Sequence, residues 1–143
     1  MHSSKKTINI FEDVKINTKL KISALWVTVM LCFVYGDILS FYKPGHIGEI
    51  MAEKMGPFSV TQVGLFVSSI LMMIPAVMVF LCLTMKVKFN RWVNLVLGIF
   101  YTAVALGNLI GELWAYYLTF GVVEMVFSLL IVWHAWNWPK QEA

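Results

Sequence analysis

Residues 58–83, FSVTQVGLFVSSILMMIPAVMVFLCL, contain no Asp, Glu, Lys or Arg. A helix needs about 20 mainly apolar residues to cross the roughly 30 Å hydrocarbon layer of a bilayer. Three further runs of this character occupy 20–42, 92–112 and 115–138. None alternates between apolar and polar residues as a membrane β-strand does, and helices satisfy their own backbone hydrogen bonds in lipid. The sequence therefore predicts an all-α, integral membrane four-helix bundle.

The composition of the whole chain agrees with a lipid environment. Of its 143 residues, 59% are apolar and 13% are charged, whereas a soluble domain carries about 25% charged residues. The apolar content excludes a disordered chain, and two Cys are too few for a disulfide scaffold or a four-thiolate zinc site. These observations indicate the solvent and the fold class, and they name no substrate.

One transmembrane domain, 20–138, is expected between a basic amino-terminal tail, 1–19, and a short tail, 139–143. The first loop, 43–57, has apolar residues at helical spacing, which predicts a short helix at the membrane surface. Asn90 is the expected N-cap of the third long helix.

The basic residues predict the orientation in the membrane. Of the 11 Lys and Arg, all except Lys43 and Lys54 lie near the amino terminus, in the second loop or at the carboxyl terminus. Cytoplasmic segments retain positive charge, so we expect both termini in the cytoplasm and a multi-pass protein of the inner or plasma membrane. The net charge of +3 then reflects topology, and no nucleic-acid partner is expected.

Small and polar residues mark one face of the third and fourth helices. They recur at steps of three and four residues, which is typical of helix faces that pack in a left-handed bundle. The two faces contain Asn94, Gly98, Tyr101, Ala105, Asn108 and Glu112, and Tyr117, Gly121, Glu124, Ser128, Ile131 and Ala135. On the second helix the inward face is expected to hold Gln62, Ser69, Met73 and Ala76.

These faces predict an outward-facing acidic cavity within the membrane. A carboxylate at the centre of a membrane helix costs about 2.5 to 3.5 kcal/mol, so it normally faces protein or water. No Lys or Arg is expected at the depth of the carboxyls to pair with them. The predicted ligand-binding residues are Asp37, Gln62, Tyr101, Asn108, Glu112 and Glu124.

Three interpretations of the carboxyls remain open. They could bind a cation or relay protons, or they could recognise an amine-bearing or polar small molecule. Alternatively, protonated carboxyls and amides form hydrogen bonds across helices with a purely structural role.

Ala103, Gly107 and Gly111 recur every four residues on another face of the third helix. Such a row permits close helix contact, either within the bundle or between two protomers. We expect the contact within the bundle, and a parallel homodimer or a partner membrane protein is the alternative.

Several kinds of chemistry lack their motifs in this sequence. Cys32 and Cys82 are expected at different depths, too far apart for a disulfide. There is no phosphate-binding Gly loop, nucleophile elbow or metal-binding His motif. We expect no cofactor and no metal, and any enzyme activity would depend on Asp37, Glu112 or Glu124.

The run WVTVMLCFVYGDILSFYKPG, residues 26–45, together with the four helices, resembles an uncharacterised family of small bacterial membrane proteins. The specific part of the resemblance is Tyr35-Gly36-Asp37. The size and layout are more loosely similar to the DoxX-like four-helix group. The resemblance implies the fold and a bacterial inner membrane, and it carries over no activity.

Binding or transport of a small polar or cationic ligand is the leading functional hypothesis, because unpaired polar groups converge on inward faces. A structural or accessory subunit that packs on another membrane protein is the second. A membrane-embedded enzyme that acts on a lipidic substrate is the third.

Overall fold

The structure, a computed structural model, describes residues 14–55 and 58–139. Most of these residues form four long helices: α1 (Thr18–Ser40), α3 (Gln62–Thr84), α4 (Val87–Leu109) and α5 (Ala115–Trp136). All four are long and apolar enough to cross a membrane. The all-α prediction is therefore confirmed, and the helices suggest a multi-pass membrane protein.

The connection between α1 and α3 contains the remaining regular structure. The short helix expected within 43–57 is confirmed as α2 (His46–Met51). It is followed by a small antiparallel hairpin of β1 (Lys54–Met55) and β2 (Phe58–Ser59). Residues 1–13 of the predicted basic tail and residues 140–143 lie outside the described part of the chain.

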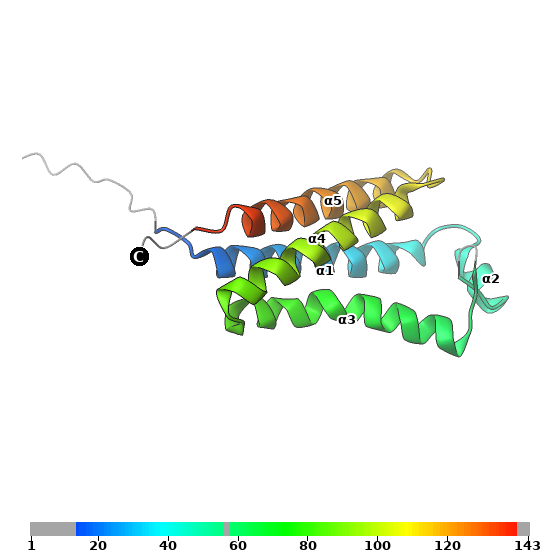
Figure 1. The fold of residues 1–143 in the computed structure, drawn as a ribbon. Helices are drawn as coiled ribbons and strands as arrows, with labels where there is room; N and C mark the ends of the chain where they lie inside the picture. Colours follow the sequence, from blue (N-terminus) through cyan, green and yellow to red (C-terminus); the bar gives the residue numbers. More distant parts are fainter. Residues whose placement is uncertain (1–13, 56–57, 140–143) are drawn as a thin grey trace, which may run out of the picture.

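The four long helices run up and down in chain order (Figure 1). The start of α1, the turn between α3 and α4, and the end of α5 lie together, and we call this the basic end (Figure 1). The opposite end carries α2, the hairpin and the turn between α4 and α5, and we call it the loop end (Figure 1). Helix α1 packs against α3 and α5, and α5 also packs against α4.

The inward faces predicted for the last two helices are largely confirmed. Asn94, Gly98, Tyr101 and Ala105 are buried in α4, and the α5 face from Gly121 to Ala135 is buried in full. Helix α3 differs, because its buried residues are Pro75, Met78 and Cys82. The predicted face of Gln62, Ser69, Met73 and Ala76 is exposed instead. Helix α3 is apolar on all sides, so packing against α1, and not polarity, determines which side is buried.

Asn90 and Asn94 form a buried polar cluster near the basic end. Trp26 Nε1 donates to Asn94 Oδ1 at 2.7 Å, and Asn94 Nδ2 donates to Asn90 Oδ1 at 2.6 Å. Asn90 Nδ2 donates to the Cys82 carbonyl at 2.5 Å. The N-cap prediction for Asn90 is therefore wrong, because α4 begins at Val87 and Asn90 lies within its first turn, where its side chain joins α4 to α3.

Basic side chains satisfy helix carboxyl ends at the basic end. Lys19 Nζ donates to the carbonyls of Leu83 and Met85 at 3.2 and 2.7 Å. Arg91 Nε donates to the carbonyl of Ala135 at 3.1 Å. The last carbonyls of a helix lack partners within the helix and carry partial negative charge, so a cation stabilises both ends. Part of the positive charge at this end thus has a structural role.

Pro75 and Tyr101 are coupled through one backbone carbonyl. Proline has no N–H, so the Leu71 carbonyl four residues earlier loses its partner within α3. Tyr101 Oη, from α4, donates to this carbonyl at 2.5 Å. A hydrogen bond between helices therefore replaces the one that Pro75 removes.

Replacing Tyr101 with Phe is expected to lower the free energy of unfolding by about 1 to 2 kcal/mol, because the Leu71 carbonyl would lose its partner in an apolar environment. Pro75→Ala restores the missing backbone N–H. In that background, Tyr101→Phe should lower the free energy of unfolding much less than it does in wild type. The check is a double-mutant cycle of denaturant unfolding in detergent. Equal costs of Tyr101→Phe in both backgrounds would contradict the coupling.

Candidate functional site

A small polar hollow lies between α1 and α5, toward the loop end. Its volume is about 10 Å³, which is about the space that one water molecule needs. Its lining contains two carboxyl groups, one phenol, two aromatic rings and two glycines. These belong to Asp37, Glu124, Tyr117, Phe33, Phe120, Gly36 and Gly121.

Glu124 is the buried member of the carboxyl pair. Only 5% of this residue is exposed, yet its carboxyl makes no hydrogen bond or ion pair with any residue that the structure describes. One turn further along α5, Ser128 is fully buried and its Oγ also has no hydrogen-bond partner within 14–55 and 58–139. Buried polar groups are normally satisfied, so these two groups stand out on the packed face of α5, and of the two Glu124 lines the hollow.

Asp37 forms the open side of the hollow. It lies near the end of α1 beside the buried Gly36, and Asp37 itself is exposed. Asp37 and Glu124 line the same hollow. Two ionised carboxyls at one small hollow repel each other, and a bound positive charge relieves that repulsion.

Glycine determines how closely the helices that carry the site approach. A Cβ added at Gly121 would overlap the side chain of Leu109 in α4. A Cβ at Gly98 would lie 2.7 Å from Val132 Cγ2 and 3.3 Å from the Ser128 carbonyl oxygen. These two glycines, which belong to the predicted faces, allow α4 to pack closely against the α5 face that carries Glu124.

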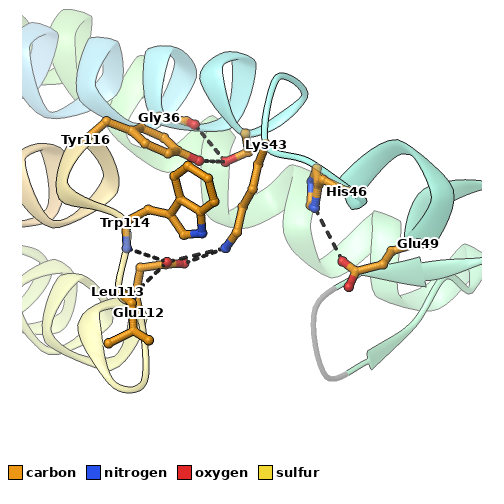
Figure 2. A network of polar contacts seen from close by, with 9 residues as sticks. Gly36, Lys43, His46, Glu49, Glu112, Leu113, Trp114 and Tyr116 are labelled. Carbon is orange, nitrogen blue, oxygen red and sulfur yellow. Dashed lines mark hydrogen bonds and ion pairs between the residues drawn. The ribbon is translucent and has the colours of Figure 1, made fainter.

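Glu112 lies outside the hollow, in a network at the loop end (Figure 2). Lys43 Nζ is 3.3 Å from both of its carboxylate oxygens and 5.6 Å from the centre of the Trp114 ring. The backbone N–H groups of Leu113 and Trp114 donate to Glu112 Oε1 at 2.9 and 3.0 Å. We call the contact between Lys43 and Glu112 the clasp, because it joins the end of α1 to the turn between α4 and α5 (Figure 2).

The prediction that no cation pairs with the carboxyls is therefore wrong for Glu112. Helix α4 ends at Leu109, so Glu112 lies in the turn and not on the inward face of a helix. There the chain folds back and brings Lys43, which is far away in sequence, into contact. Next to the clasp, Ser40 Oγ and Tyr116 Oη are 3.2 Å apart (Figure 2).

The hydrogen bond from the Trp114 N–H, together with the Leu113 N–H and Lys43, lowers the pKa of Glu112 below its ordinary value of 4.5. A carboxyl whose pKa is lower in the folded state stabilises the fold above its unfolded pKa, and that contribution is lost as the pH falls through the folded pKa. We therefore expect wild type to be more stable than Glu112→Gln above pH 4.5, with the difference shrinking below it. Thermal unfolding of both proteins between pH 7 and 3 measures this, and a constant difference would contradict the assignment.

Three other predicted ligand-binding residues do not line the hollow. Gln62 is the first residue of α3 and is exposed, and Asn108 is exposed near the end of α4. Tyr101 is buried but donates to the Leu71 carbonyl. Of the predicted set, the structure brings Asp37 and Glu124 together at the hollow.

The small-residue row lies elsewhere than expected. Ala103 and Gly107 are exposed on α4, and nothing lies within 4 Å of a Cβ added at Gly107. Gly111 lies beyond the helix, at a φ of 81° that favours glycine. The expected use of this row within the bundle is therefore wrong, and the close helix contact is made at Gly98 and Gly121.

The donor set limits what the hollow can hold. Two carboxyls and a phenol fall short of the about six to eight oxygen ligands that Ca²⁺ takes. Among the described residues, no three His, Cys, Asp or Glu side chains lie close enough to hold a metal ion together. The space and charge suit a proton or one small monovalent cation.

Comparison with protein families gives a match over residues 8–143 to the model of DUF6326, a family of unknown function. The expected resemblance to an uncharacterised family is thereby confirmed, and the looser similarity to the DoxX-like group stays a prediction. The comparison with curated proteins finds no match, and the comparison with solved structures finds none either.

Proposed function

We propose that this chain, which belongs to the DUF6326 family of unknown function, is a multi-pass membrane protein that binds an ion. The binding site lies between Asp37 and Glu124, and the ion is a proton or a small monovalent cation. The observation that carries the proposal is Glu124, a carboxyl that is 5% exposed and has no partner in the described structure. An ionisable residue inside a membrane helix is costly and is normally kept for function. Binding at this site would be one step of ion-coupled transport.

The charge distribution supports one orientation of the protein in the cell membrane. Lys15, Lys19, Lys21, Lys86, Lys88 and Arg91 belong to the basic end, whereas the acidic residues that the structure describes lie in the loop-end half. The positive-inside rule then places the basic end, with both termini, in the cytoplasm. In this orientation the Asp37 side of the hollow lies nearer the outer surface.

The size of the hollow favours an ion over an organic ligand. A drug-sized ligand needs a pocket of about 300 to 1,000 Å³, and this hollow has about 10 Å³. We therefore narrow the leading hypothesis to a proton or a monovalent cation. A polar molecule or an amine would need α1 and α5 to move apart.

The test is a concentration jump on liposomes that contain the protein, adsorbed on a solid-supported membrane. Binding of an ion inside the membrane displaces charge and gives a transient current. A pH jump, or a jump in Li⁺, Na⁺ or K⁺ at constant ionic strength, should give a current that empty liposomes lack, and the effective ion identifies the ligand. The absence of a protein-dependent current for all four ions would overturn the proposal.

A second candidate function, an accessory subunit, is favoured by one observation. Ala103 and Gly107 are exposed on α4, and small residues on a membrane helix permit close approach of another helix. The partner would be a second copy or another membrane protein. Gly107→Leu should then abolish assembly while the fold persists.

A further inference from the structure

A larger, apolar groove lies between α1 and α5 at the basic end, away from the carboxyl site. Its volume is about 480 Å³. Its lining consists mostly of apolar side chains, with one lysine, one threonine and one histidine. These residues are Ile16, Leu20, Lys21, Ala24, Leu25, Thr28, Phe127 and His134.

Two of the three polar side chains of the groove lie near one end of it. Lys21 lies in the first turn of α1 and His134 in the last turn of α5, and both line the groove. Lys19 and Arg91 donate to helix carbonyls, whereas the side chain of Lys21 forms no hydrogen bond or ion pair with residues 14–55 or 58–139. The groove thus has a lysine side chain without a partner in the described structure, and an imidazole, where the helices reach the membrane surface.

From Lys21 the groove extends toward the middle of the bundle along Ala24, Leu25 and Thr28 of α1, with Phe127 of α5 opposite. From Lys21 to Thr28 the α1 side extends about 10 Å, at about 1.5 Å per residue. One leaflet of the hydrocarbon layer is about 15 Å thick. The apolar part therefore covers about two thirds of the thickness of one leaflet, in the direction of a lipid chain whose headgroup lies beside Lys21.

We infer that this groove binds an anionic phospholipid, with the phosphate at Lys21 and His134 and one acyl chain along Ala24, Leu25 and Phe127. The ammonium of Lys21 pairs with the phosphate, and an imidazole N–H of His134 donates to it. Basic pockets between membrane helices are suited to acidic headgroups, and among the residues that the structure describes no carboxylate lines this groove. The inference requires the protein to lie in a membrane, and it is independent of the ion site at Asp37 and Glu124.

Native mass spectrometry of the full chain in detergent tests the inference. Dioleoyl phosphatidylglycerol and dioleoyl phosphatidylcholine are added at equal concentrations, and bound lipid is counted for wild type, Lys21→Gln, Ala24→Trp and the control Lys88→Gln. Lys88 lies in α4 at the same end and does not line the groove. Far-ultraviolet circular dichroism confirms that each variant is folded.

Wild type should bind phosphatidylglycerol at least tenfold more tightly than phosphatidylcholine. Lys21→Gln should weaken phosphatidylglycerol binding at least tenfold. Loss of a lysine that acts only through the surface potential would weaken the binding about fivefold at most. Ala24→Trp should abolish binding because the indole fills the groove, and millimolar inorganic phosphate should not displace the lipid.

Three results would overturn the inference. Equal weakening by Lys21→Gln and Lys88→Gln would show that general electrostatics attracts the lipid. Equal binding of both lipids would remove the role of the headgroup charge. A dimer that Ala24→Trp abolishes, with no lipid preference, would assign the groove to a second copy of the chain.

Discussion

Replacing Glu124 with Gln is expected to reduce the ion-induced charge displacement at least tenfold. Gln has the size of Glu and forms hydrogen bonds as a protonated carboxyl does, but it cannot release a proton or balance a cation. If Glu124 only joined helices as a neutral group, Gln would replace it with little effect. The variant therefore separates the ion-binding interpretation from the structural one.

The matched control for this experiment is Glu49→Gln. Glu49 lies in α2 at the loop end, where its only ion pair in the described structure is with His46, at 3.5 Å. Glu49 does not line the hollow, so Glu49→Gln should give the same current as wild type. Asp37→Asn should lower the apparent ion affinity while some displacement remains, because the buried carboxyl would still be present. A full current in Glu124→Gln would rule out the site.

Gly98→Leu should be among the most destabilising single substitutions in this chain, with a loss of about 3 kcal/mol or more in the free energy of unfolding. The first carbon of the new side chain would already lie 2.7 Å from Val132 Cγ2 and 3.3 Å from the Ser128 carbonyl oxygen. The Ser128 carbonyl belongs to the backbone of α5 and cannot rotate away. Helices α4 and α5 would therefore have to separate along the face that carries Glu124.

Gly107→Leu is the control, because it makes the same change on the same helix where nothing lies within 4 Å of the added Cβ. Its unfolding free energy should equal or exceed that of wild type, since leucine favours helix more than glycine does. Thermal or denaturant unfolding in detergent measures both variants. Similar stability of Gly98→Leu and Gly107→Leu would contradict the close packing of α4 and α5. Loss of a dimer or partner in Gly107→Leu alone would support the accessory-subunit function.

The buried faces of α4 and α5 could be predicted because their small and polar residues differ from the lipid-facing Leu, Val and Phe around them. Gly98 and Gly121 recur in step with the other buried positions, so the pattern alone indicates which side packs. Helix α3 offers no such contrast. Its buried side, Pro75, Met78 and Cys82, depends on the shape of α1 and on the partners that Tyr101 and Asn90 provide.

The candidate site was predictable in part for the same reason. Asp37 and Glu124 stand out because carboxyls in apolar helices are costly, and the helical period placed Glu124 on the packed face of α5. The same reasoning extended α4 through Glu112, whereas the helix ends at Leu109 and Glu112 turns toward Lys43. A polarity pattern indicates a preference for lipid or protein, and it does not identify the partner.

The sequence by itself determined the number of long apolar helices, the faces on which α4 and α5 pack, and the presence of carboxyls that need compensation. These properties depend on the local order of residues, because the cost of exposing a side chain to lipid is set by that side chain alone. The tertiary structure decided the rotation of α3, the clasp between Lys43 and Glu112, and the meeting of Asp37 with Glu124 at a hollow with room for about one water molecule. These depend on how side chains from distant segments fit together, since packing and hydrogen bonding act only over the distance of direct contact.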